Sequence, residues 1–404
     1  MITFIKNNKH FTTITIINLF SKLGDRLFYI AMLSTAATLP HKNLAVMLVS
    51  FSETLPILCS FFLGSLADKK TKKSLLLIQT SVLRALIYII IGILFHYSPT
   101  LYLIILSTIF NFLSDLAGNF SSALVIPFTK TLVKVDEMPQ AQGIVSIASQ
   151  LVNVFSTLLG SFLLVFISKT LLAWLNSSIF LLTGLGFLII RKLLSNLETH
   201  LPHTIDTLST WKLVKYNFIK LYQDRITFIE LLQLTLINGF FGGLIPVFTL
   251  FVQKSTHLLP NSISIALLSA CITIFMIIGN AISSKFMKNF NNIFFTYLID
   301  FAIVVTGFVF YSHNTFFILL LVSFVALLLG IISPRFSAKV INKYPIENVG
   351  GIITTVNSLL VLTPPLTSII FPLFAVHSLT TAYLSIIIYG VSLLLVNVIS
   401  SYKH

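Results

Sequence analysis

Charged side chains are scarce in this chain. Asp, Glu, Lys and Arg make up only 9% of its 404 residues, whereas 56% of the residues are hydrophobic. A soluble protein would carry about a quarter charged residues, and no soluble core could absorb this much apolar surface. The composition therefore excludes an ordinary soluble protein and favours one embedded in a lipid bilayer.

Cysteine is nearly absent as well. Cys59 and Cys271 both lie in apolar segments, where a thiol is expected to act as a small buried hydrophobic group. We therefore expect no disulfide framework and no metal site. The sequence also has no glycine-rich phosphate loop and no nucleophile constellation, so we expect neither an enzyme nor a cofactor.

Acidic residues are the rarer of the charged residues, and the formal net charge is +14. A basic protein can be a nucleic-acid binder when its basic residues cluster on one face. Here they lie in short turns between apolar segments, so we expect no nucleic-acid partner.

The apolar segments are long enough to cross a bilayer, which takes about 20 residues at a rise of about 1.5 Å each. The first segment contains Asp25 and Arg26 and is too long for a cleaved signal, so we interpret it as a retained helix. Twelve spans are predicted, at residues 11–37, 44–67, 75–95, 101–128, 143–167, 170–190, 226–252, 263–284, 293–311, 315–332, 351–376 and 379–400.

One connection, residues 191–225, is long and polar, whereas most others are short. The predicted fold class is an all-α polytopic membrane protein with two pseudo-symmetric six-helix halves, residues 1–190 and 226–404, joined by this cytoplasmic linker. A weak internal repeat supports the two halves, although chance is the alternative because Gly and Pro are common in membrane helices. The repeat pairs Gly24, Gly64, Pro127 and Gly143 with Gly239, Gly279, Pro334 and Gly350. In the eleventh span, Pro364 and Pro365 are expected to kink the helix.

The basic residues indicate an orientation. The sequence has 26 lysines and arginines, and nearly all of those in loops fall on the side of both termini. Because cytoplasmic loops carry the excess of Lys and Arg, we expect both termini in the cytoplasm. The exceptions are three lysines in loops on the opposite side, Lys42, Lys169 and Lys254. Three further basic residues, Lys22, Arg26 and Arg84, lie inside spans.

The turn between the second and third spans, residues 64–73, reads GSLADKKTKK. It resembles the loop motif of the major facilitator superfamily, in which Gly-x-x-x-Asp precedes basic residues. The resemblance implies a conformational role for this motif, whose Asp pairs with neighbouring helix ends and helps to hold the outward-facing state. The matching residues are Gly64, Asp68, Lys69, Lys72 and Lys73. The alternative is that Asp68 is a solvated loop charge.

Three further stretches resemble the bacterial drug-efflux branch of that superfamily, which includes macrolide-efflux and enterobactin-exporter proteins. They are residues 22–29, the Glu53-x-x-Pro56 pattern and residues 123–143. Two departures weaken the implied antiport. Ser283 stands where the second-half copy of the loop motif would have its Asp, and Gly160 is nearly the only glycine where antiporters carry a Gly-Pro-rich motif.

Ionisable residues inside spans are candidate functional residues, because charge is costly at the bilayer centre. Helix rise places Asp25 about 21 Å along the first span, and Glu53 and Asp115 about 22 Å from the cytoplasmic edge. Each is a proton-coupling candidate, with Glu53 and Asp25 ranked before Asp115. The charge partners are Arg26 and Arg84, the latter about 16 Å deep. The alternative is that these pairs only fix helix packing.

We expect a monomeric secondary active transporter in the cytoplasmic membrane of a bacterium. Its expected activity is export of a hydrophobic or amphipathic small molecule (a drug, macrolide or secondary metabolite) as a proton antiporter by alternating access, driven by the proton gradient. One alternative is a facilitator or importer of a metabolite. Another, from a different class, is a lipid scramblase or a membrane-embedded enzyme, which would need polar catalytic groups at one interface.

The predicted orientation can be tested by cysteine labelling. In a variant that lacks Cys59 and Cys271, a cysteine introduced at position 42 or 254 should react with a membrane-impermeant maleimide added to intact cells. A cysteine at position 212 should react only after the membrane is opened. The reverse pattern would show that the assigned orientation is wrong.

Overall fold

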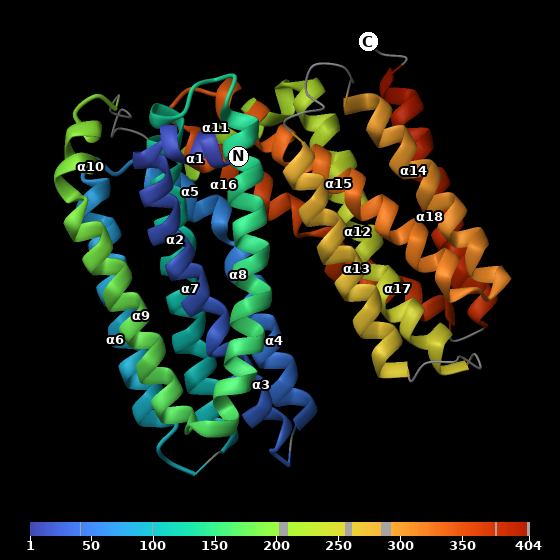
Figure 1. Ribbon diagram of the computed structural model, residues 1–404, viewed down its shortest axis with the longest axis horizontal. Coiled ribbons are helices and arrows are strands. Elements are labelled where there is room, and N and C mark those ends of the chain that lie inside the picture. The colour runs from blue at the N-terminus through green and yellow to red at the C-terminus, as the bar shows by residue number, and fades with distance from the viewer. Residues whose placement is uncertain are drawn as a thin grey trace. The chain divides into compact units, whose positions relative to one another are not determined.

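The computed structural model describes residues 1–40, 42–98, 100–201, 209–254, 261–283, 292–375 and 378–401. Within these ranges the chain is helical and contains no β-strand (Figure 1). The basic residues Lys285, Lys288 and Lys403, which contributed to the predicted orientation, lie outside the described residues, as does part of the linker, residues 202–208.

The helices follow one another with short connections. In the first part of the chain they are α1 (Ile2–Asn7), α2 (Lys9–Leu27), α3 (Tyr29–Ala37), α4 (Lys42–Leu58), α5 (Ser60–Asp68), α6 (Lys73–Leu94), α7 (Leu101–Leu132), α8 (Met138–Phe166), α9 (Lys169–Ile189), α10 (Arg191–Glu198) and α11 (Thr210–Gln223). They continue as α12 (Arg225–Lys254), α13 (Asn261–Ile282), α14 (Asn292–Val309), the 3₁₀ helix η2 (Phe310–Ser312), α15 (Thr315–Lys343), α16 (Val349–Leu360), α17 (Thr363–Ala375) and α18 (Leu379–Ser401).

Eleven segments of the described chain are long and apolar enough to cross a membrane, and each overlaps one of the predicted spans from 44–67 onward. The remaining predicted span, residues 11–37, consists of α2 and α3, which meet at Phe28 in a nearly helical conformation. Its three charged residues Lys22, Asp25 and Arg26 lower its hydropathy below that of the others. The twelve-helix architecture is therefore confirmed.

Helix ends and breaks refine the predicted spans. The helices α7 and α15 continue to Leu132 and Lys343, beyond the predicted ends. The expected kink in the eleventh span is present: α16 ends at Leu360 and α17 begins at Thr363, directly before Pro364 and Pro365.

The chain divides into two compact units. Unit 1 contains residues 1–138, 148–220 and 340–358, and unit 2 contains residues 139–147, 221–339 and 359–404. This partition follows packing, whereas the halves predicted at 1–190 and 226–404 follow the internal repeat. The predicted domain boundaries stay a prediction.

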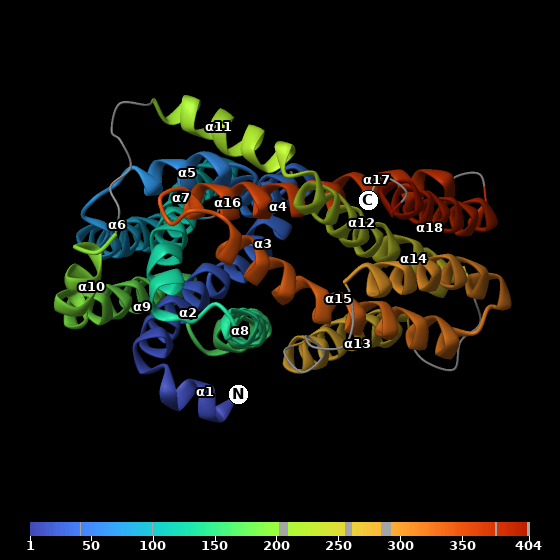
Figure 2. The same cartoon turned by 90° about the horizontal axis from the view of Figure 1, so that it is seen from above.

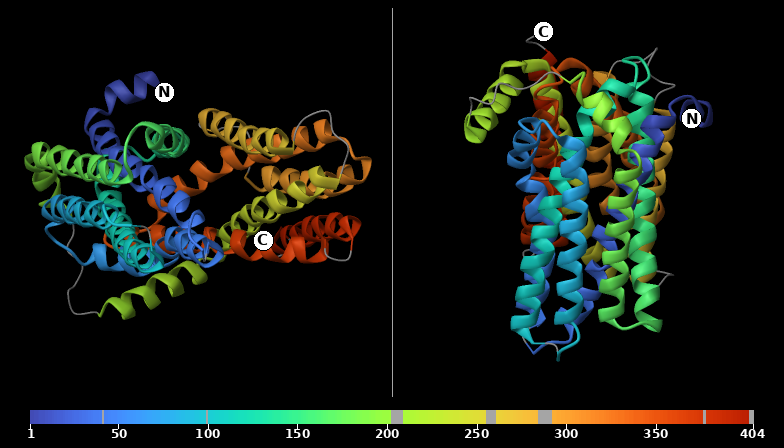
Figure 3. Two further views of the ribbon diagram at one scale, coloured as in Figure 1. Left: turned by 90° about the horizontal axis from the view of Figure 1, so that it is seen from below. Right: turned by 90° about the vertical axis from the view of Figure 1, so that its left-hand side faces the viewer.

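In unit 1, α6 and α9 pack side by side (Figure 2). The axes of the long helices of this unit are roughly aligned (Figure 3). An aromatic cluster lies between α6, α9 and α2–α3: the ring of Tyr88 is 5.6 Å from that of Phe28 and 5.3 Å from that of Phe180. Gly24 permits this approach, because a Cβ atom there would lie 2.6 Å from the ring of Phe180.

Unit 2 has its own polar contacts between helices. The side chain of Thr367 on α17 donates to the carbonyl of Gly239 on α12 (2.6 Å). Asp300 on α14 accepts a hydrogen bond from Asn397 on α18, which itself accepts one from Gln233 on α12. Together these bonds join α12, α14, α17 and α18, and they pair the buried polar groups that form them.

The close approach at Gly24 predicts a loss of stability on substitution. Gly24→Ala should lower the apparent melting temperature of the purified protein by several degrees, because overpacking a core costs about 1–3 kcal/mol. Gly184→Ala is the matched control, since its nearest contact would be 3.3 Å, to Ser81. Equal melting temperatures for both variants would contradict the close packing of α2 against α9.

Candidate functional site

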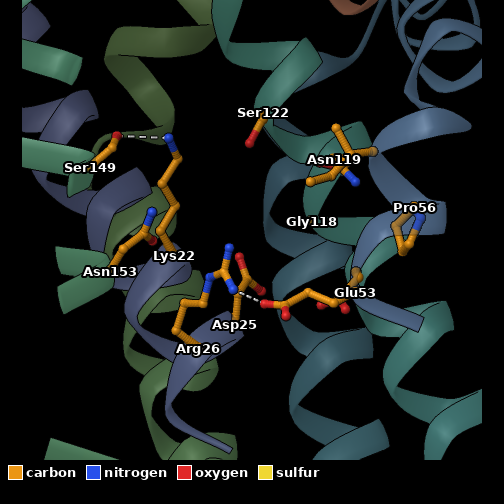
Figure 4. Close-up of a pocket in the computed structure, with 12 residues that line it drawn as sticks. Lys22, Asp25, Arg26, Glu53, Pro56, Gly118, Asn119, Ser122, Ser149 and Asn153 are labelled. Atoms are coloured by element: carbon orange, nitrogen blue, oxygen red, sulfur yellow. Dashed lines mark hydrogen bonds and ion pairs between the residues drawn. The ribbon is translucent and has the colours of Figure 1, made fainter. Parts of the chain in front are cut away.

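A polar cavity of about 190 Å³ lies between α2, α4, α7 and α8 of unit 1 (Figure 4). The three predicted carboxylates all line it. The complete lining is Lys22, Asp25, Arg26, Glu53, Pro56, Ile57, Asp115, Gly118, Asn119, Ser122, Ser149 and Asn153. The structure therefore brings together the acids that the sequence placed at similar depth.

Helical spacing explains why these side chains share one cavity. Residues three and four apart lie on the same helix face, and Lys22, Asp25 and Arg26 have this spacing on α2. Ser149 and Asn153 repeat it on α8. These side chains therefore share one face of each helix, and both faces line the cavity.

The first ion pair joins Arg26 on α2 to Glu53 on α4. Both side chains are partly accessible, with exposed fractions of 35% and 23%. They project toward each other from opposite walls of the cavity (Figure 4). The Arg26–Glu53 pair is therefore accessible from the cavity.

The second ion pair joins Asp25 to Arg84, whose side chain is 1% exposed. The guanidinium also donates to the hydroxyls of Ser21 (2.6 Å) and Ser114 (3.1 Å). It lies 3.9 Å from the centre of the Phe180 ring. Arg84 is thus held by three helices, α2, α7 and α9, whereas its partner Asp25 lines the cavity and is 31% exposed.

Asp115 differs from the other two carboxylates. Its Oδ2 accepts a hydrogen bond from Asn111 (2.9 Å), and Asn111 in turn accepts one from the hydroxyl of Tyr88 (2.6 Å). Its Oδ1 is buried and has no hydrogen-bond partner within the described chain. Asp115 is therefore a third cavity carboxylate that is held by a neutral chain of hydrogen bonds and not by a direct ion pair.

The cavity also contains polar residues that were not among the predicted site residues. Lys22 donates to the hydroxyl of Ser149 (2.9 Å), and Asn119, Ser122 and Asn153 complete the wall. The signal for Lys22 was present, because a lysine inside a span is unusual and its spacing from Arg26 puts both on one face.

The turn at residues 64–73 forms a second site in unit 1. Oδ1 of Asp68 accepts a hydrogen bond from the backbone N–H of Gly350 (3.1 Å), and Oδ2 accepts one from Gly351 (2.6 Å). These N–H groups belong to the first turn of α16, where backbone donors lack helical partners and favour an anion. Asp68 is 5% exposed, which does not fit a solvated loop charge.

The other residues of the turn support this contact in different ways. Gly64 lets α5 approach α16, because a Cβ atom there would lie 2.8 Å from the carbonyl of Gly350. Lys73 is buried and donates to the carbonyl of Ala67 (2.5 Å), which holds the end of α5. Lys69 is half-buried and Lys72 is exposed.

Comparison with known proteins gives the family. The sequence profile described as Major Facilitator Superfamily matches residues 14–365. The chain belongs to this superfamily. No curated protein sequence gives a significant match.

Solved structures of other major facilitator proteins share the fold. A bacterial homologue of the iron transporter ferroportin, in an outward-facing state, superposes with a TM-score of 0.69 at 14% identity, covering 97% of this chain and 99% of that one. The proton:xylose symporter XylE, bound to 6-bromo-6-deoxy-D-glucose, gives 0.66 at 12% identity, with 97% and 95% covered. The human organic anion transporter MFSD10 (TETRAN) gives 0.66 at 14% identity, with 96% and 98% covered.

In this major facilitator protein the second copy of the loop motif lacks its carboxylate. Gly143 matches Gly350 in the internal repeat, and a Cβ atom on Gly143 would lie 3.0 Å from the carbonyl of Asn280 and 3.5 Å from the hydroxyl of Ser283. Unit 2 thus keeps a close approach of backbone at this position, but Ser283 offers a neutral hydroxyl where Asp68 offers a charge.

The contact of Asp68 with α16 predicts a specific loss. Asp68→Asn should reduce transport at least tenfold while leaving expression and membrane insertion intact, because an amide presents one acceptor oxygen where the carboxylate presents two. Transport can be measured in cells that express equal amounts of each protein. Lys70→Gln is the control, since Lys70 is exposed and is not among the matching residues of the motif. Full transport by a well-expressed Asp68→Asn variant would show that the contact has no functional role.

Proposed function

We propose that this protein is a secondary active transporter that exports a hydrophobic or amphipathic small molecule in exchange for protons. Its family is a family of membrane transporters, and the observation that carries the proposal is the unequal pairing of the acids in the polar cavity. Glu53 is paired with Arg26, which is partly exposed, and Asp25 is paired with Arg84, which is buried and held by three helices. Asp115 has no partner of opposite charge in direct contact.

Proton coupling needs a carboxylate whose partner changes during the cycle. When Arg26 moves away from Glu53, the charged form of Glu53 loses its stabilisation in a low-dielectric site and takes up a proton. When Arg26 returns, the proton leaves. Glu53 is therefore the proposed carrier, with Asp115 as a second candidate, and Asp25 is assigned to holding Arg84.

The energy source follows from the chemistry that the sequence offers. The sequence contains no phosphate-binding glycine loop for nucleotide hydrolysis. We therefore propose that the proton gradient drives transport and that no cofactor takes part. The basic residues of the loops support a bacterial cytoplasmic membrane with both termini in the cytoplasm. The stretches at residues 22–29 and 123–143 support the drug-efflux branch of the superfamily. A monomer is proposed, because one chain forms the cavity.

An amphipathic substrate suits the surfaces that α4 and α7 offer. Both helices line the polar cavity, and both also line an apolar groove of about 370 Å³. The groove is formed by Met47, Leu48, Ser52, Leu55, Thr108, Ile109 and Phe112. A compound with one polar and one apolar part would find partners for each part on the same two helices.

A facilitator or importer of a metabolite is the second candidate. The observation in its favour is the helix α8, where Gly160 is nearly the only glycine, in place of the Gly-Pro-rich motif of antiporters. A facilitator would move its substrate only down a gradient, so a protonophore would leave its steady state unchanged, whereas an importer would accumulate the substrate inside the cell.

Efflux of ethidium and of a macrolide, measured with and without a protonophore, tests the proposal. Glu53→Gln should reduce uphill efflux at least tenfold and remove its pH dependence, because glutamine keeps the shape and hydrogen bonding of the side chain but cannot titrate. Downhill substrate exchange should persist. Asp115→Asn and Asp25→Asn are measured beside it.

The outcomes separate the candidates. If uphill efflux persists in Glu53→Gln but is lost in Asp115→Asn, Asp115 and not Glu53 is the proton carrier. Uphill efflux that survives in all three variants would contradict a carboxylate carrier in this cavity. If no compound moves against its gradient in the unaltered protein, the proton-coupled proposal is wrong and the facilitator replaces it.

A further inference from the structure

Lys22 is a cationic group of the cavity that the proposed proton cycle does not use. It lies on α2, one helical turn from Arg26, and its ammonium group donates to the hydroxyl of Ser149 on α8 (2.9 Å). Within the described chain it forms no ion pair, whereas both arginines of the site do. In Figure 4 its side chain extends to the α8 wall, away from Glu53.

Lys22 is the cavity cation without a carboxylate in direct contact. Arg84 pairs with Asp25 and Arg26 pairs with Glu53, whereas the ammonium group of Lys22 contacts only a neutral hydroxyl among the described residues. Its positive charge therefore has no direct partner. An uncompensated charge within the membrane costs several kcal/mol, so an anion that enters the cavity beside Lys22 is stabilised.

The groups around Lys22 suit an anion of modest size. The hydroxyls of Ser122 and Ser149 and the amides of Asn119 and Asn153 line the same cavity, and each can donate a hydrogen bond to a carboxylate oxygen. A cavity of about 190 Å³ has room for about six water molecules at about 30 Å³ each. It therefore accepts a polar head group and leaves the apolar body of a larger compound outside.

We infer that Lys22 binds the carboxylate of the transported compound, so that the substrate class is an amphipathic organic acid. This inference rests on the proposed function for the statement that the cavity carries the cargo, but binding of an acid at Lys22 can be measured without transport. Lys22 touches the substrate in this assignment, and Ser149 positions its ammonium group.

Binding of matched compounds to the purified protein in phosphatidylcholine nanodiscs tests the assignment. Two series are compared: 2-naphthoate with 2-naphthamide and 2-naphthylmethylamine, and decanoate with decanamide and decylamine. In at least one series the acid should bind at least tenfold more tightly than the amide, since hydrogen bonds to charged groups are the stronger ones.

Variants connect this preference to Lys22. Lys22→Gln should remove the preference for the acid and leave amide binding within about twofold. Lys22→Arg should keep the preference, because the charge remains. Lys192→Gln is the matched control, since it removes an exposed lysine of α10 outside the cavity. Should Lys22→Gln fail to fold, Ser149→Ala replaces it and should weaken acid binding alone.

Three results would overturn the inference: no preference for the acid in either series, a preference for the amine, or a preference that survives in Lys22→Gln. The proposed function is judged separately. Protonophore-sensitive efflux without acid preference would leave the proposed function standing and remove the substrate class. If acid binding depends on Lys22 but no uphill transport is seen, the binding site is supported and proton-coupled export is contradicted.

Discussion

The pairing of charge inside a low-dielectric environment is the constraint on which the rest of unit 1 depends. A charge at the bilayer centre is costly, and removing one partner of a buried pair costs about 3–5 kcal/mol. Arg84 meets this constraint through Asp25, Ser21, Ser114 and the face of Phe180. These contacts join α2, α7 and α9, so the same guanidinium that satisfies a carboxylate also fixes the wall behind the cavity.

Much of the fold was accessible from the sequence, because hydrophobic length is a local property. The spans, the kink before Pro364 and the turn around Asp68 all follow from residues that are adjacent in sequence. The pairing of the acids was not accessible. Helix rise gives the depth of a side chain, but the rotation of its helix depends on packing, so depth alone could not assign Arg84 to Asp25 and Arg26 to Glu53.

Two further features needed the structure for the same reason. The partners of Asp68 are backbone groups of Gly350 and Gly351, which have no side chain to mark them as ligands. Lys22 was visible as a charge in a span, but its neighbour Ser149 lies on another helix. Structures with 12–14% identity share the fold. Because one fold serves many functions, the fold does not identify the transported compound, and that information lies in the side chains of the cavity.

Recognition of α16 through its main chain has a consequence for how this protein can vary. Because Asp68 binds two N–H groups, the contact is independent of most side chains on α16. A bulky residue at position 350 would meet the carboxylate itself, since a Cβ atom on Gly350 would lie 3.2 Å from Cγ of Asp68. A larger side chain at this glycine pair therefore requires a change at Asp68, whereas Thr354 and Ser358 of α16 are constrained by their own contacts with α5. In unit 2 the matching position holds Ser283, so a side chain at Gly143 would meet a neutral hydroxyl and a backbone carbonyl and no carboxylate.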